Sequence, residues 1–399
     1  MATTQGWRQL DIAIIGGGIG GQASATSLRR QGHKVTIYER ADFAGEVGAS
    51  ISCAANGTRF LEDWKVNIEL GDPVILKKLI SRDWKTGEPV SVYDLADYKE
   101  RWGYTYYMFH RQYMHTMLMD SALSESGDGI PAKLIVNHKA ETVDPETGEI
   151  TFSNGNKAKH DVVIGADGIG SAVRKSLGIE VSRTPATCTC LHANVDTEKA
   201  VKLGLIDYSQ NSAIEYWGGY HTHYKIVLSP CNGAPYPDLD RNVFKHLALG
   251  YEVRPWRLWL HEPYPLWQKG VTCIIGDAAH PMMPDQSQGA CQAIEDSGAL
   301  GLVFSKQNFN GDIKQALEVF EEVRKPRGTK VQAASARARE NINERIGFSS
   351  NTDNEVYSVA NEEGKLTIDE MNRYDMKAHI REVLLRRRGE VSEPTNGKA

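Results

Sequence analysis

The feature that most constrains the fold is a glycine-rich turn between a short apolar run and a helix near the start of the chain. Residues 10–15 read Leu-Asp-Ile-Ala-Ile-Ile, a β-branched run that predicts a buried strand. A helix is expected from about residue 20 to 31, and a second strand over 34–38. The turn between the first strand and the helix has the pattern G-x-G-x-x-G, formed by Gly16, Gly18 and Gly21. This order predicts a βαβ unit of a parallel, doubly wound sheet.

Each part of this unit has a mechanical role in binding a dinucleotide. Gly16 permits the tight turn, Gly18 lets the backbone approach a pyrophosphate, and Gly21 lets the helix pack on the strand. The helix N-terminus offers free N–H groups to the phosphates. Glu39 ends the second strand, where a carboxylate can accept a hydrogen bond from a ribose hydroxyl, and Arg40 beside it joins the predicted site. The unit alone does not distinguish FAD from NAD.

Length, charge and cysteine content exclude several classes of protein. The 399 residues favour two to three domains, and the net charge of −5 gives no electrostatic reason to expect nucleic acid as a partner. No apolar run approaches the roughly 20 residues of a membrane span. Residues 1–10 lack the pattern of a signal peptide, so we expect a cytoplasmic protein. The six cysteines are sparse and form no C-x-x-C pair, so we expect reduced thiols and no metal.

Two further segments each combine a buried strand with a sharp turn and a helix. Residues 161–168 form a predicted strand that ends in Ala166-Asp167-Gly168, with a helix over 171–177. Residues 271–275 form another, which leads into Gly276-Asp277 and then a helix from about 291 to 304. A carboxylate at a strand end, such as that of Asp277, can hold sugar-like hydroxyls such as a ribityl chain. Backbone N–H groups at the start of the following helix can face a ring that develops negative charge.

In this order and spacing, the three motifs resemble those of the FAD-dependent aromatic hydroxylases, which are single-component flavoprotein monooxygenases. The salicylate-hydroxylase-like branch is the nearest because of the run 276–296, and the resemblance covers about residues 8–345. It implies an α/β fold like that of p-hydroxybenzoate hydroxylase, with a Rossmann-like FAD-binding domain, an inserted β-sheet substrate domain and C-terminal helices. The implied FAD-binding domain is 8–177 with 266–345, the substrate domain is an unusually short 178–265, and a C-terminal helix and tail occupy 346–399.

The resemblance also assigns roles to individual residues. Gly16, Gly18 and Gly21 would hold the FAD pyrophosphate, and Glu39 the adenosine ribose. Arg111 would contact the FAD chain with help from Gln112, while His110 would orient Arg111. Asp167 and Gly168 would serve FAD and, transiently, the nicotinamide cofactor. Asp277 would bind the ribityl chain, and Gly289 and Ala290 would place N–H groups near the pyrimidine edge of the flavin. His280 would be structural.

The implied reaction is hydroxylation of a phenolic or aromatic-acid substrate, with or without decarboxylation. NADH or NADPH would reduce FAD, and the flavin hydroperoxide formed with O₂ would deliver the oxygen. We expect a monomer or homodimer.

The catalytic base is harder to place. The predicted substrate-domain strands include 212–216 and 221–228, with a turn at 217–219, and Tyr216 and His221 are the catalytic candidates. The alternative is that both are ordinary packed or surface residues.

Other functions remain open at this point. The same scaffold would also suit oxygenation of a non-aromatic natural-product intermediate. Relatives usually carry some tens of residues more after residue 233, so the shortened domain would leave the pocket more open, or would leave a non-catalytic FAD-binding protein. A plain NAD dehydrogenase is least favoured, because Asp167-Gly168 and Gly276-Asp277 would then have no role. Towards the C-terminus, we expect a helix over 312–323 that stops or kinks near Pro326, a charged helical stretch over 328–346, and a last helix over 367–388.

Overall fold

A six-stranded sheet positions all three motifs. The computed structural model describes residues 6–42, 50–218, 225–229, 241–350 and 364–390, and the fold below refers to these. The strand order is β17-β18-β12-β1-β2-β8. The strands are β1 (Asp11–Ile15), β2 (Lys34–Tyr38), β8 (Lys133–Ile135), β12 (Val162–Gly165), β17 (Gln268–Lys269) and β18 (Thr272–Ile274). All neighbours pair in parallel except β17 with β18. Strands buried on both faces require the continuous apolar runs found in β1, β12 and β18.

Register brings the ends of the three motif strands to one edge of this sheet. Ile15 of β1 lies opposite Gly165 of β12, and Gly165 lies opposite Ile274 of β18. The turns that follow these strands therefore leave the sheet side by side. In an open parallel sheet, this carboxyl edge is where ligands bind.

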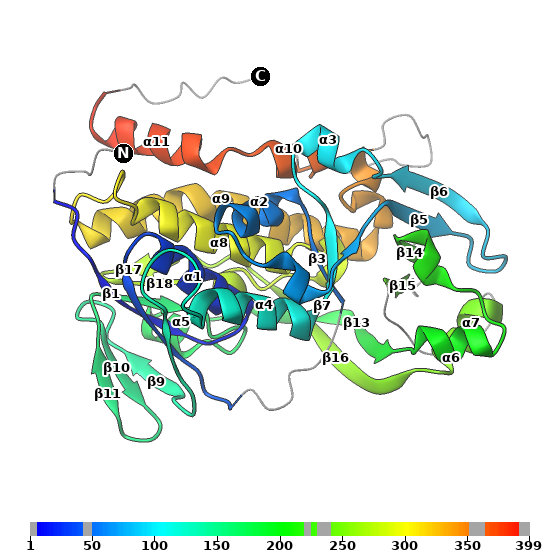
Figure 1. Cartoon of the computed structure of the whole chain (residues 1–399), viewed down its shortest axis with the longest axis horizontal. Helices are drawn as coiled ribbons and strands as arrows, with labels where there is room; N and C mark the ends of the chain where they lie inside the picture. The colour runs from blue at the N-terminus through cyan, green and yellow to red at the C-terminus, as the bar shows by residue number, and fades with distance from the viewer. Residues whose placement is uncertain (1–5, 43–49, 219–224, 230–240, 351–363, 391–399) are drawn as a thin grey trace.

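Helices cover the sheet, and two of them are in close contact (Figure 1). Ser24 Oγ of α1 (Ile19–Arg30) and Ser297 Oγ of α8 (Gly289–Val303) are 2.9 Å apart, which ties the two helices together. The long helix α9 (Ile313–Glu340) runs beside α8, with α11 (Met376–Arg387) packed on α9. The other helices are α2 (Ala55–Asp63), α3 (Tyr98–Trp102), α4 (Arg111–Leu123), α5 (Ala172–Ser176), α6 (Thr197–Lys202), α7 (Arg241–Leu247) and α10 (Ile368–Arg373).

A second group of strands forms the other side of the site. The four-stranded sheet β15-β14-β5-β6 consists of β5 (Lys78–Arg82), β6 (Pro89–Asp94), β14 (Ala213–Gly218) and β15 (Lys225–Leu228). A separate antiparallel ribbon pairs β13 (Arg183–Asn194) with β16 (Tyr251–His261). Because β14 pairs in parallel with β5, this sheet includes residues 78–94 from outside the predicted substrate domain. The domain boundaries themselves stay a prediction.

Two smaller sheets complete the described strands. The first, β3-β7-β4, consists of β3 (Ser50–Cys53), β4 (Val74–Ile75) and β7 (Tyr107–His110), and the second, β11-β10-β9, of β9 (Ala140–Val143), β10 (Glu149–Phe152) and β11 (Lys157–Lys159). Short 3-10 turns occur at η1 (Ile68–Gly71), η2 (Tyr208–Asn211), η3 (Gly276–Ala278), η4 (Pro284–Gln286), η5 (Ile342–Glu344) and η6 (Phe348–Ser350). Cys53, Cys190, Cys273 and Cys291 are free cysteines, as expected.

The structure corrects three details of the predicted elements. Helix α9 continues through Pro326, because contacts from α8 to arginines on either side of it offset the roughly 3 kcal/mol cost of an internal proline. The expected turn at 217–219 is wrong for Trp217 and Gly218, since the fully buried Trp217 pairs with Ile226 and extends β14. The last helix is two helices, because Asp375 caps a new start by accepting from the backbone N–H of Ala378.

A buried ionic network joins α8 to α9. Arg324 donates to Glu295 at 2.5 Å and to Asp296 at 2.8 Å, and all three are buried. Asp296 also accepts from His280 Nε2 at 2.6 Å and from the backbone N–H of Gly276 at 2.9 Å. Burial alone would raise the pKa of the Asp296 carboxyl, but the nearby His280 and Arg324 outweigh it and lower that pKa to about 2. The network therefore fixes the turn that carries Asp277.

Removing the cation from this network should be strongly destabilising. We expect Arg324→Met to lower the free energy of unfolding by about 3–5 kcal/mol, because two buried carboxylates each lose a cationic partner with which they share a hydrogen bond. Arg373→Met is the matched control, since its ion pair with Asp369 is exposed and should contribute less than about 1 kcal/mol. Urea unfolding followed by circular dichroism measures both. Equal effects of the two substitutions would contradict this account.

Candidate active site

A cavity of about 840 Å³ opens at the carboxyl edge of the six-stranded sheet. One end is lined by the turn after β1 and by Glu39 and Arg40. The other end reaches Tyr216 on β14 and Arg345 beyond α9. Between them lie the turn after β12, the turn after β18 and the start of α8. The cavity thus connects all three sequence motifs with the second group of strands.

The first glycine turn is shaped to receive a phosphate group. Gly16 has φ +103°, and a Cβ there would lie 2.4 Å from the carbonyl oxygen of Ala166. A Cβ on Gly21 would lie 2.0 Å from the carbonyl oxygen of Gly16, so the helix approaches the strand too closely for a side chain. Gly18 differs, because a Cβ there would meet nothing within 4 Å and would project into open space at the cavity. That space, at the N-terminus of α1, fits the pyrophosphate of a dinucleotide.

Glu39 closes the nucleotide end of the cavity. Its carboxylate is 9% exposed and accepts from the backbone N–H groups of Gly17 at 2.7 Å and Ala41 at 2.8 Å. These bonds hold the glycine turn against the end of β2. Each carboxylate oxygen can accept a second hydrogen bond, which leaves capacity for a ribose hydroxyl. Arg40 is exposed at the same end of the cavity.

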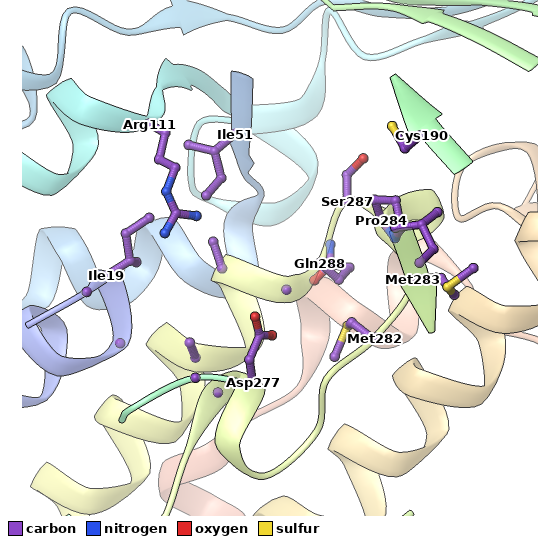
Figure 2. Close-up of a pocket in the computed structure, with 18 of the residues that line it drawn as sticks. Ile19, Ile51, Arg111, Cys190, Asp277, Met282, Met283, Pro284, Ser287 and Gln288 are labelled. Atoms are coloured by element: carbon purple, nitrogen blue, oxygen red, sulfur yellow. The ribbon is translucent and has the colours of Figure 1, made fainter. Parts of the chain in front are cut away.

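Arg111 and Asp277 face the cavity from opposite sides (Figure 2). Arg111 begins α4, and Asp277 lies in the turn after β18. Desolvation by the surrounding protein raises the pKa of the Asp277 carboxyl. His280 and Arg111 partly oppose this rise through their charge interactions with the carboxyl. A chain of hydroxyls and phosphates between them would meet an acceptor on one side and a cation on the other.

Three other candidate residues near Arg111 and Asp277 do not line the cavity. Gln112 is exposed and lies outside the cavity lining, although sequence reasoning placed it beside Arg111. The ring of His110 packs against Tyr113 with centroids 5.1 Å apart, and its orienting role stays a prediction. His280 is 1% exposed and bound to Asp296, in agreement with a structural role.

The turn after β12 contributes mainly its backbone. Asp167 accepts from Ser171 Oγ at 2.5 Å and from the backbone N–H of Ala172 at 2.7 Å, so its carboxylate caps the short helix α5. Burial raises the pKa of this carboxyl. Gly168, at φ +73°, lines the cavity beside it. A role for either residue towards the nicotinamide cofactor stays a prediction.

The start of α8 faces the middle of the cavity. Gly289 and Ala290 form its first residues and both line the cavity. Gln288, just before them, accepts from Asn56 Nδ2 at 2.9 Å, which fixes the turn into the helix. The N-terminus of this 15-residue helix, with its positive end of the helix dipole, therefore borders the cavity. Its role towards a flavin ring stays a prediction.

The far end of the cavity contains charged groups that sequence reasoning missed. Tyr216 is buried there, with its ring in edge contact with Phe348 and the Arg345 guanidinium 5.0 Å from its centroid. Burial raises the pKa of the Tyr216 hydroxyl. Lys225 and Asp285 form an ion pair of 2.8 Å beside it. These residues come from separate segments. Lys225 and Arg345 belong to no motif, and Asp285 lies within the run 276–296 but was given no role there. His221 lies outside the described residues.

This arrangement defines a Rossmann-type protein with a site that suits FAD, and comparison with known proteins identifies the family. The model of the FAD binding domain family matches residues 9–234. The chain belongs to this family, and it is a flavin-dependent monooxygenase of the aromatic hydroxylase group. The α/β, p-hydroxybenzoate-hydroxylase-like fold and FAD as cofactor are thereby confirmed.

Two curated relatives and one solved structure illustrate the match. The chain is 29% identical over 374 residues to hispidin-3-hydroxylase of Neonothopanus nambi, covering 82% of this chain and 87% of that protein. It is 30% identical to 3-hydroxybenzoate 6-hydroxylase of Klebsiella oxytoca over 80% and 85% of the two chains. The fold matches that of Klebsiella pneumoniae HpxO complexed with FAD and uric acid, with a TM-score of 0.70, 21% identity and coverage of 94% and 96%. Among the described helices, none is long and apolar enough to span a membrane.

The two glycines of the first turn allow a test of the FAD site. Gly18→Val should leave the fold intact, because a Cβ at this position has no neighbouring atom within 4 Å. It should weaken FAD binding by more than tenfold, or about 1.4 kcal/mol, by filling the cradle. Gly21→Val should instead destabilise the protein itself, because it collides with the Gly16 carbonyl. Flavin absorbance after gel filtration and thermal unfolding of the apoprotein separate the two effects. Full FAD retention by Gly18→Val would refute this placement.

Proposed function

We propose that the protein uses NADH or NADPH, FAD and O₂ to hydroxylate an aromatic ring that already carries a hydroxyl group. The observation that supports this most directly is the extension of the cavity past the start of α8 to a buried, polar end. The nucleotide portion accounts for FAD. The remaining space, lined by Tyr216, Lys225 and Arg345, is where a small second molecule would lie next to the flavin.

When bound, FAD supplies the redox chemistry that transfers electrons from the nicotinamide to O₂; the chain supplies binding, orientation and exclusion of water. Apolar side chains form much of the wall between the two ends: Ile214, Leu258, Met282 and Met283. They suit the faces of an aromatic ring and keep water from the reacting atoms. The α8 N-terminus and Arg345 add positive potential, which stabilises negative charge on the flavin and on an ionising hydroxyl.

The relatives support the same class of substrate. Both relatives are named as hydroxylases, one of hispidin and the other of 3-hydroxybenzoate. The second of these substrates is a hydroxylated aromatic acid. We therefore place hydroxylated aromatic compounds ahead of non-aromatic intermediates. The monomer or homodimer expected from the sequence stays a prediction.

The decisive experiment measures cofactor and turnover in one preparation. The purified protein should be yellow, and 3-hydroxybenzoate or another phenolic compound of a panel should accelerate oxidation of NADH or NADPH, whereas benzoate should not. Product analysis by mass spectrometry should show one added oxygen atom, and H₂O₂ measurement gives the uncoupled fraction. Oxygenated product from non-aromatic compounds alone would replace this proposal with the alternative chemistry.

Tyr216 should contribute through its hydroxyl. This hydroxyl is buried and has no hydrogen-bond partner in the described part of the chain, so it is available to a substrate. Tyr216→Phe should lower kcat/KM about tenfold, the value of one hydrogen bond of about 1.4 kcal/mol, and leave FAD content unchanged. The exposed Tyr113→Phe serves as the control. Steady-state kinetics with an unchanged kcat/KM for Tyr216→Phe would remove Tyr216 from the reaction.

A further inference from the structure

Asp285 lies at the junction of the flavin site and the far end of the cavity. It belongs to the short turn η4, four residues before the start of α8, and its side chain lines the cavity. Its Oδ1 accepts from Lys225 Nζ at 2.8 Å, and Arg339 approaches to 3.8 Å. Lys225 also donates to the carbonyl oxygen of Ala338 at 2.9 Å. The side chains of Asp285 and Lys225 are each only 7% exposed.

The second oxygen of this carboxylate has no described partner. Asp285 Oδ2 is buried, and no group in the described ranges donates a hydrogen bond to it. A buried acceptor without a donor costs about 1–3 kcal/mol, and more when the group is charged. The ion pair with Lys225 engages Oδ1 only and leaves Oδ2 unsatisfied. A ligand that brings a donor to this oxygen would remove the cost.

The surroundings of Oδ2 favour a hydroxyl as that donor. The Tyr216 hydroxyl, at the same end of the cavity, is also buried and without a described partner. Arg345, over the face of Tyr216, places a positive charge where an oxygen that loses its proton would gain negative charge. An acceptor beside a cation is the combination that binds and then ionises a phenolic hydroxyl.

We propose that Asp285 accepts a hydrogen bond from the ring hydroxyl of the substrate and takes its proton as the ring is oxygenated. This inference rests on the proposed function. With O₂ reduced by two electrons from NADH or NADPH through FAD, its O–O bond would break as one oxygen bonds to a ring carbon, and the other oxygen would leave as water. In the same step the substrate O–H bond breaks, its electron pair forms a ring C=O bond, and the proton moves to Oδ2. When the ring carbon then loses its hydrogen as a proton to water, aromaticity returns and Asp285 gives its proton back to the carbonyl oxygen.

Lys225 is the positioning residue for this step. It holds Oδ1 at 2.8 Å and thereby fixes the direction of Oδ2. The substrate hydroxyl becomes a much stronger acid as the ring loses electron density, which favours transfer of its proton to Oδ2.

The test compares two ligands on the FAD-loaded protein without a reductant. Flavin absorbance changes report the binding of 3-hydroxybenzoate and of benzoate, which lacks the ring hydroxyl. Asp285→Asn should weaken binding of 3-hydroxybenzoate about tenfold and of benzoate less than twofold. Lys225→Met should reduce the preference for the hydroxylated ligand in the same direction. Asp144→Asn, a surface carboxylate in an Asx turn, is the matched control and should change neither.

Each outcome separates this inference from the proposed function. If the wild-type protein prefers 3-hydroxybenzoate and both variants keep that preference, Asp285 is not the acceptor although the proposed function stands. Equal weakening of both ligands also overturns the inference, since it reports a merely structural role. If the FAD-loaded wild-type protein prefers no phenolic compound of the panel over its counterpart without the ring hydroxyl, the proposed function and this inference fail together. In turnover, Asp285→Asn should lower product formation at least a hundredfold while H₂O₂ rises.

Discussion

The parallel pairing of β1, β12 and β18 is the constraint on which the site depends. Parallel strands in register end at the same edge of the sheet, so three turns separated by up to 260 residues meet there. The first supplies a glycine cradle, the second supplies backbone and a helix cap, and the third supplies Asp277. A one-residue slip in either pairing would turn the side chains of a strand to its other face and displace its turn from the cavity.

The pairing is maintained by polar groups as much as by apolar contacts. Asp296 accepts from Gly276, His280 and Arg324, and so connects the turn after β18 to α8 and α9. Glu39 similarly ties the turn after β1 to the end of β2. Buried carboxylates are stabilising only when their partners are complete, so each also specifies a single arrangement of its turn. The rigidity of the FAD site thus follows from hydrogen bonds made behind it.

The sequence could predict the nucleotide end of the site because local rules govern it. Strand, glycine turn and acid follow one another within 30 residues, and both Gly16 and Gly21 are positions where a side chain would collide with backbone. The same rules failed where tertiary contacts decide. Pro326 remains inside α9 because arginines on either side bind Glu295, and Trp217 extends a strand because it is buried against Ile226. Gln112 is exposed and outside the cavity lining, and its role towards FAD stays a prediction.

Tyr216 was a candidate from the sequence and lines the far end of the cavity, but the charged groups around it could not be predicted, since they belong to three segments that only the fold brings together. Lys225 comes from a strand, Asp285 from the turn before α8, and Arg345 from the turn after η5. Nothing in the spacing of 225, 285 and 345 indicates contact. Their meeting places the ion-paired carboxylate of Asp285 and the guanidinium of Arg345 in the lining of one cavity. The motifs that line the nucleotide end can be recognised locally in the sequence, whereas the charged groups of the far end are joined only by long-range packing, and the two can vary independently within one fold.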